Sequence, residues 1–168
     1  AVAVGECGLD FYVETLDRDR QQRLFVSQLE LARRHDLPLI LHARRATEAV
    51  LQALKARPGL RGVVHSYSGS LEQARELWRL GFYLGFGGPL TYPRATRLQA
   101  LVRQLPLEQI LLESDAPDQP NSDRRGQRNE PAFLPAVLSQ LAAIRGIPAA
   151  ELGAITRDNA CRLFALPG

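Results

Sequence analysis

Short apolar runs alternate with longer amphipathic stretches along this chain, and this alternation limits the possible fold more than any other feature of the sequence. Each run is short and apolar almost throughout, as in the strands of a sheet that is buried on both faces. The runs lie at 1–6 (AVAVGE), 37–42 (LPLILH), 62–65 (GVVH), 82–88 (FYLGFGG) and 110–115 (ILLESD). The sequence therefore predicts five strands.

The stretches between the runs carry apolar residues at spacings of three and four, which is typical of amphipathic helices. Ser70 before the third stretch suits a helix N-cap, and Gly81 after it suits a C-cap. The sheet is expected to be parallel, because each helix carries the chain back to start the next strand in the same direction. The predicted helices cover 16–35, 45–57, 71–80 and 95–104, and the predicted fold class is α/β.

Two architectures fit such a sheet, an open doubly wound fold and a TIM-type barrel. The open nucleotide-binding fold carries the loop G-x-G-x-x-G after its first strand, and GECG at 5–8 does not match it. A complete (β/α) barrel has about 250 residues, whereas this chain has 168. We predict a TIM-type barrel that is incomplete, with about five of eight parallel strands. One domain over 1–168 and two or three C-terminal helices from about 132 to 164 are expected, and the apolar start in mid-strand predicts that an N-terminal piece is missing.

Composition indicates an ordinary globular protein, with 45% hydrophobic and 23% charged residues. No apolar stretch approaches the roughly 18 residues that span a membrane, and the start lacks the pattern of a secretory signal. Cys7 and Cys161 are too few and too far apart for a disulfide framework, so we expect a cytoplasmic protein without a membrane partner. The net charge of +3 is compatible with a phosphate-bearing substrate but is too small and too dispersed to indicate one by itself.

Side chains that can bind a metal close four of the five apolar runs. They are Glu6, His42, His65 and Asp115. The carboxyl ends of parallel strands meet on one side of the sheet, where α/β barrels place their active sites, so we expect these groups to converge. Two imidazoles and two carboxylates suit zinc, manganese or another divalent ion.

Each of these residues has a plainer interpretation when it is taken alone. A single histidine at a strand end is more often a hydrogen-bonded structural residue than a ligand, and a single buried carboxylate is more often paired with arginine. The joint pattern favours a metal site, because two of the three histidines close apolar runs and carboxylates close two more. The third histidine, His35, lies near a predicted helix end and is expected at the surface.

Six segments of the chain carry a family resemblance when they are taken in order. They are AVGECGLDFY at 3–12, LPLILHAR at 37–44, GVVHSYSGS at 62–70, LGFYLGFGG at 80–88, LLESDAPD at 111–118 and NEP at 129–131. Each motif is weak alone, whereas six in the same order over nearly the whole chain are specific. In this order they resemble the successive motifs of the TatD family of metal-dependent deoxyribonucleases.

The resemblance implies a TIM-type barrel of the amidohydrolase superfamily that hydrolyses DNA, single-stranded or at a strand end, with one or two divalent ions (zinc, magnesium or manganese). It implies that Glu6 contacts or bridges the metals and that His42 and His65 are imidazole ligands. Asp115 would bind metal and orient or deprotonate the attacking water, as the catalytic residue. The family's H-x-H motif does not occur in this sequence, so two ligands expected from the resemblance are absent. The oligomeric state is not indicated.

Two other functions remain open at this point. The same strand-end ligands serve many reactions on this fold, so the substrate could instead be a small ester, amide or phosphoester. A catalytically inactive barrel fragment that binds a partner is the alternative from another class of protein.

Three further residues are candidates for substrate binding. Arg44, two residues beyond His42, suits a two-pronged contact with a phosphate, with a surface salt bridge as an equal alternative. Ser68 is a candidate hydroxyl donor to the substrate, although an ordinary turn fits its spacing better. Asn129 follows an arginine-rich loop, where the resemblance favours a place at the edge of the site and helix capping is the alternative.

Overall fold

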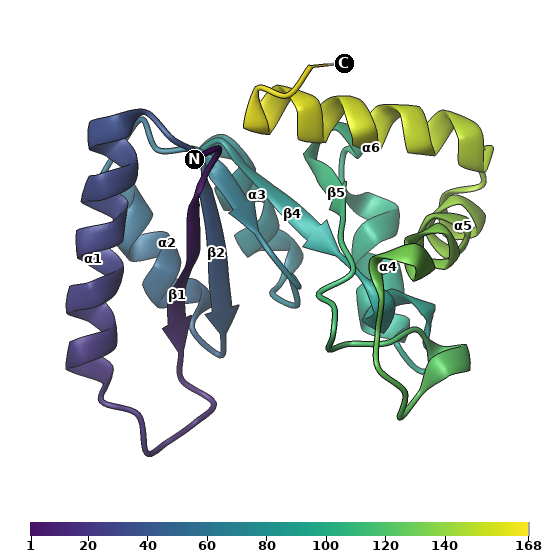
Figure 1. Cartoon of the computed structure of the whole chain (residues 1–168), viewed down its shortest axis with the longest axis horizontal. Helices are drawn as coiled ribbons and strands as arrows, with labels where there is room; N and C mark the ends of the chain where they lie inside the picture. Colours follow the sequence, from purple (N-terminus) through teal and green to yellow (C-terminus); the bar gives the residue numbers. More distant parts are fainter. Residues whose placement is uncertain (168) are drawn as a thin grey trace.

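Five parallel strands form one sheet in the order β1-β2-β3-β4-β5 (Figure 1) in a computed structural model that describes residues 1–167. The strands are β1 (Val4–Asp10), β2 (Leu39–Arg44), β3 (Gly62–Val64), β4 (Phe82–Phe86) and β5 (Ile110–Leu112). Every neighbouring pair is parallel, so the predicted α/β class is confirmed. Within residues 1–167, β1 and β5 are the two edges of the sheet, which makes the barrel incomplete.

Helices connect the strands and follow the last of them. They are α1 (Arg18–His35), α2 (Thr47–Lys55), α3 (Leu71–Arg79), α4 (Thr96–Gln104), α5 (Leu134–Arg145) and α6 (Ala149–Phe164). The predicted N-cap Ser70 accepts a hydrogen bond from the Gln73 N–H, and the Gln73 side chain accepts one from the Ser70 N–H. Gly81 follows α3 with a φ of 86°, a left-handed conformation that glycine adopts readily.

No single helix in residues 1–167 is long and apolar enough to cross a membrane. The segments Pro131–Arg145 and Ala149–Phe164 meet the length and composition requirements only as a pair, and that pair is bent by 111°.

The first strand lies further along the chain than predicted. β1 spans Val4–Asp10 instead of 1–6, so Glu6 lies inside the strand rather than at its end. The glycines and the glutamate of GECG concealed the strand, because both residue types are uncommon in strands. The buried Cys7 and Leu9 alternate with less buried neighbours, which is the period of two expected of a strand.

The other strands begin near the predicted positions and end differently. β2 continues two residues past His42 to Arg44, and β3 ends just before His65. β5 ends at Leu112, so Asp115 belongs to the following loop and not to a strand end. The predicted run at 110–115 combines a short apolar strand with the first three residues of a polar loop, which no turn residue separates from the strand.

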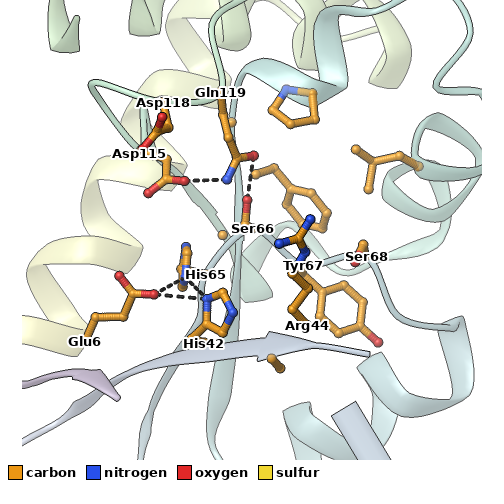
Figure 2. Close-up of a pocket in the computed structure, with 16 residues that line it drawn as sticks. Glu6, His42, Arg44, His65, Ser66, Tyr67, Ser68, Asp115, Asp118 and Gln119 are labelled. Atoms are coloured by element: carbon orange, nitrogen blue, oxygen red, sulfur yellow. Dashed lines mark hydrogen bonds and ion pairs between the residues drawn. The ribbon is translucent and has the colours of Figure 1, made fainter. Parts of the chain in front are cut away.

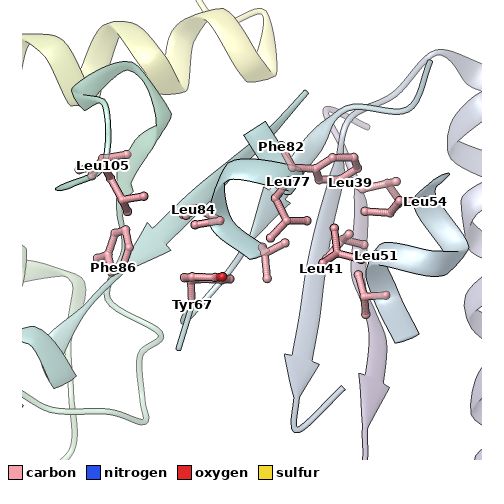
Figure 3. Close-up of a cluster of buried hydrophobic side chains, with 14 of the residues drawn as sticks. Leu39, Leu41, Leu51, Leu54, Tyr67, Leu77, Phe82, Leu84, Phe86 and Leu105 are labelled. Carbon is pink, nitrogen blue, oxygen red and sulfur yellow. The ribbon is translucent and has the colours of Figure 1, made fainter. Parts of the chain in front are cut away.

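Alternate residues of a strand face opposite sides of the sheet, and each side buries its own cluster. The larger cluster joins the sheet to the surrounding helices (Figure 3). Its fully buried members include Leu39 and Leu41 of β2, Phe82 and Leu84 of β4, Leu51 and Leu54 of α2, and Leu77 of α3. Each such side chain contributes roughly 1.5–3 kcal/mol when it is removed from water, so this cluster fixes the positions of the strands.

The opposite side of the sheet is apolar at one end and polar at the other. Apolar residues of β3, β4 and β5 pack there against Leu163 of α6, and Ile40 of β2 joins them. The next residue of β2 on this side is His42. Figure 1 shows α6 near the end of the sheet that lies opposite the tips of β1 and β2. On this side of the sheet, α6 does not cover the ends of β1 and β2, and polar residues lie there.

Candidate metal centre

Three side chains from neighbouring strands meet at the polar end of this face (Figure 2). Glu6 Oε1 lies 3.0 Å from His42 Nδ1 and 2.8 Å from His65 Nε2, and the two imidazole nitrogens lie 3.2 Å apart. Glu6 belongs to β1, His42 to β2, and His65 directly follows β3. The parallel pairing of these strands thus brings together three of the four residues that the sequence suggested as ligands.

The donor atoms of this group suit a divalent cation. With bonds of about 2.0–2.1 Å to a tetrahedral ion, two ligand atoms stand about 3.3 Å apart, and the separations between Glu6, His42 and His65 are close to this value. One carboxylate and two imidazoles form the mixed oxygen and nitrogen set that zinc accepts. The other nitrogen of His42, Nε2, is buried and lies 3.4 Å from Asp10 Oδ2, a carboxylate placed to orient the ring. The residues present therefore fit a metal ion.

A second carboxylate stands behind His65. Glu113 Oε1 lies 3.8 Å from His65 Nδ1 and accepts a hydrogen bond of 2.6 Å from the Ser66 backbone N–H. The Glu113 carboxylate, followed by the charges of Glu6 and Asp115, raises the pKa of His65 to about 9 although burial opposes this shift. A cation that displaces the proton from His65 would therefore find a strongly basic ligand in a negative environment.

Asp10, at the end of β1, links His42 to the rim of the site. Its Oδ1 accepts a hydrogen bond of 2.8 Å from the Tyr12 N–H, and its Oδ2 lies 4.0 Å from Arg44 Nη1. Burial raises the pKa of Asp10, but the backbone N–H groups of Tyr12 and Val13 outweigh this effect and bring the pKa below its ordinary value. The carboxylate beside His42 is therefore ionised at neutral pH.

Asp10 and Glu113 are two site residues that were not predicted from the sequence. Both could have been found from the period of two along a strand, because Asp10 stands four residues after Glu6 and Glu113 stands two residues after Leu111 of β5. Gly85 of β4 was a further signal. A β-carbon at this position would overlap the Glu113 carboxylate, so glycine keeps that space free.

Asp115, the fourth suggested ligand, lines the same cavity but stands outside the three-residue group. Its Oδ2 accepts a hydrogen bond from Gln119 Nε2, and Gln119 Oε1 in turn accepts one of 2.8 Å from the Ser66 hydroxyl (Figure 2). Asp115 has a φ of 55°, in the left-handed region. The loop after β5 thus turns its carboxylate toward the cavity without adding it to the group formed by Glu6, His42 and His65.

The cavity beside these residues has a volume of about 760 Å³ and an open mouth. Arg44 and Ser68, two of the suggested substrate-binding residues, line it. The Arg44 guanidinium lies 3.7 Å from the centre of the Tyr12 ring, a cation–π contact. Both residues are therefore accessible to a molecule that enters the cavity.

Asn129, the third suggested substrate-binding residue, does not line the cavity. Its side chain is buried, and its amide donates hydrogen bonds of 2.6 Å to the Ser114 carbonyl and 2.8 Å to the Asp118 carbonyl. Its Oδ1 accepts a hydrogen bond from the Glu130 N–H. A buried amide satisfied in this way holds the loop that carries Asp115, so the structure gives Asn129 a position behind the site and not at its edge.

Comparison with known protein families identifies the family to which this fold belongs. The family model for TatD related DNase matches residues 1–165. The chain belongs to the TatD family. The family resemblance predicted from the sequence is therefore confirmed, and Glu6, His42 and His65 lie within the matched residues.

Individual TatD relatives are similar over almost the entire chain. The uncharacterised metal-dependent hydrolase YjjV of Escherichia coli K12 is 44% identical over 99% of this chain, which spans 64% of the relative's length. The crystal structure of E. coli YjjV matches with a TM-score of 0.92 and 43% identity, over 98% of this chain and 64% of that chain. The 3'-5' ssDNA/RNA exonuclease TatD of Rahnella sp. strain Y9602 is 39% identical, over 98% of this chain and 65% of its own length.

Proposed function

We propose that this protein is a divalent-metal-dependent hydrolase that cleaves phosphodiester bonds of DNA, either in single-stranded DNA or at the end of a strand. The observation that carries the proposal is the meeting of Glu6, His42 and His65 around a common point beside a cavity that Asp115 and Arg44 also line. The exonuclease name of the Rahnella relative supports nucleic acid as the substrate class. Cytoplasmic location belongs to the same proposal, since Cys7 and Cys161 are both free.

Each residue has a distinct part in the proposed reaction. Glu6, His42 and His65 hold the metal, which when bound lowers the pKa of water and neutralises charge on phosphoryl oxygens. Asp115 accepts the proton from the attacking water, because its carboxylate lines the cavity beside the ligand group. Asp10 and Glu113 keep the imidazoles oriented and the site negative.

Substrate binding is assigned to the rim. Arg44 forms a two-pronged contact with a non-bridging phosphate pair, and its stacking on Tyr12 restricts the guanidinium before the substrate arrives. Ser68 donates its hydroxyl to the next phosphate along the strand. The positive charge of Arg44 offsets the repulsion between the carboxylates of the site and the phosphates of a nucleic acid.

The proposal is tested by incubating the chelator-treated protein with fluorescent single-stranded DNA, labelled at either end, with and without manganese, magnesium or zinc. We expect cleavage only when metal is added. His65→Ala should reduce the rate by more than about 100-fold, since a metal ligand is lost. His35→Ala is the matched control, because His35 is exposed at the end of α1.

Other results would overturn the proposal. Metal-independent cleavage, or equal activity in the His65→Ala and His35→Ala variants, would remove the ligand group from the reaction. Turnover of a panel of small esters, amides or phosphoesters with no cleavage of DNA would favour the small-substrate hydrolase. No metal-dependent turnover of any of these would favour a catalytically inactive binding protein.

A further inference from the structure

The position of Asp115 relative to the metal group is set by a side chain with no assigned role. Asp115 lies in the loop beyond β5, outside the group of Glu6, His42 and His65, so the sheet itself does not position it. The only side-chain hydrogen bond that its carboxylate makes within residues 1–167 comes from Gln119 Nε2. Gln119 also lines the cavity (Figure 2).

The Gln119 amide has one orientation that satisfies both of its neighbours. An ionised carboxylate accepts hydrogen bonds only, so the Asp115 side requires the NH₂ group of the amide. The amide oxygen must then face Ser66, whose hydroxyl donates to it at 2.8 Å. The Asp115 carboxylate therefore fixes the direction of the Gln119 amide, and the Ser66 hydroxyl holds that amide in place by donating to its oxygen.

The same hydrogen-bond chain continues to the metal group. The Ser66 backbone N–H donates to Glu113 Oε1 at 2.6 Å, and this oxygen lies 3.8 Å from His65 Nδ1. Asp115 and His65 are thus connected through Gln119, Ser66 and Glu113. The last link, at 3.8 Å, is an ion-pair distance and not a hydrogen bond. Glu6 and His42 lie on strands and His65 directly follows one, so a displacement of Gln119 would alter the place of Asp115 while leaving the ligand group in position.

The backbone supports this interpretation. Ser66, Asp115 and Gln119 have φ values of 49°, 55° and 50°, a left-handed conformation that residues other than glycine rarely adopt. Such conformations persist where the surroundings determine them and gather at functional sites. Here the surroundings include Asn129, whose amide donates to the Asp118 carbonyl at 2.8 Å and to the Gln119 carbonyl at 3.3 Å.

We propose that Gln119 is a positioning residue that holds the Asp115 carboxylate by Oδ2 and leaves Oδ1 to accept the proton of the attacking water. This inference rests on the proposed hydrolase function. The inference adds that catalysis needs a second residue of the loop after β5, Gln119, to hold the base Asp115 in place. Gln119 acts through Asp115 and does not itself contact the reacting atoms.

The test is the variant Gln119→Asn, which keeps an amide but is one methylene too short to reach both neighbours. Asparagine tolerates the left-handed backbone at this position, so the loop should fold. We expect kcat to fall by about 10–100-fold, because a misplacement of about 1 Å can cost 100-fold, while KM stays within about threefold. The matched control is Gln127→Asn, the same change at an exposed position of the same loop, which should leave kcat unchanged.

A second variant guards against misfolding of the first. Ser66→Ala removes the hydroxyl that donates to the Gln119 amide oxygen but keeps the backbone N–H that contacts Glu113. We expect a smaller fall in kcat, of about 3–10-fold, since the Gln119 contact with Asp115 is loosened but not removed. Thermal unfolding followed by circular dichroism verifies that each variant is folded.

A crystal structure of the metal-free Gln119→Asn protein supplies a readout that does not depend on turnover. We expect the Asp115 side chain to change rotamer or lose order while Glu6, His42 and His65 keep their positions. An unchanged Asp115, an unchanged kcat, or a rise in KM alone would each overturn the inference. If the unsubstituted protein shows no metal-dependent hydrolysis, the proposed function fails, and the crystal structure still decides whether Gln119 positions Asp115.

Discussion

Carboxylates lie beside both nitrogens of the His65 ring, Glu6 at Nε2 and Glu113 at Nδ1. An outer carboxylate of this kind orients a ligand histidine and increases its basicity, and its loss typically weakens metal binding by about 10–100-fold. We therefore expect Glu113→Gln, which keeps an acceptor for the Ser66 N–H, to weaken zinc binding by about 10–100-fold in titration calorimetry. Glu108→Gln changes an exposed carboxylate and should bind zinc normally. Equal zinc affinity in the two variants would contradict this role for Glu113.

The raised pKa of His65 also predicts how the stability of the metal-free protein depends on pH. A folded-state pKa of about 9, against an ordinary value of 6.5, means that the folded protein holds this proton more tightly than the unfolded chain. The stabilisation is therefore fully present below pH 6.5 and is lost as the pH rises through about 9. With a chelator present, we expect Tm to fall across this range, and to fall less in Glu113→Gln. Parallel Tm curves for the two proteins would show that Glu113 is not the cause.

At the scale of whole elements, two glycines allow the strands to approach each other and the site. A β-carbon on Gly8 of β1 would overlap the backbone carbonyl of His42 on β2, whereas one on Gly85 of β4 would overlap the Glu113 carboxylate and lie 3.2 Å from the His65 Cα. We expect Gly8→Ala to destabilise the fold by about 1–3 kcal/mol, a fall in Tm of roughly 2–4 °C per kcal/mol for a chain of this size. Gly85→Ala should keep most of that stability and lose zinc affinity instead. Calorimetric unfolding and zinc titration of both variants separate the two effects, and a reversed pattern would refute this assignment.

The elements also show why a sequence predicts the existence of strands better than their ends. Leu39 and Leu41 are apolar because they are buried, and the apolar run that contains them predicts β2. The N-cap residue Ser70 predicts where helix α3 begins. In β1, the residues that approach the site are glycines and carboxylates, which carry no strand propensity. Their strand conformation comes from pairing with β2, a contact between distant segments that no local pattern contains. The strand ends that carry the candidate metal centre are the least regular part of the sequence.

At the scale of the molecule, one apolar cluster takes buried side chains from β1 to β5 and from α1 to α6. Because these elements share a core, we expect a single cooperative unfolding transition, with coincident curves from circular dichroism and Trp78 fluorescence. Cys7 offers a third probe, since burial, followed by the charge of Glu6, raises the pKa of its thiol to about 12. Iodoacetamide should reach Cys7 only as fast as the whole protein unfolds, while the less buried Cys161 reacts in the folded state. Separate transitions, or rapid labelling of Cys7, would show that the core is divided.

The sequence was sufficient to predict the class of fold and the meeting of Glu6, His42 and His65, because parallel topology alone brings the strand ends to one side. It was insufficient for the residues held by loops. Gln119 and Asn129 act through hydrogen bonds to carbonyls and side chains of other segments, and their sequence neighbourhood is that of an ordinary polar loop. Such contacts depend on distances in the folded chain, so they become visible only when the fold is known.

The buried amide of Asn129 has a consequence for how this molecule can change. It ties the carbonyls of Ser114, Asp118 and Gln119 to one point, so the base of the arginine-rich loop is closed independently of what the loop contains. Residues 123–128 are therefore not needed to hold Asp115 in place. Exchanges of residues within that stretch should leave the position of Asp115 unchanged.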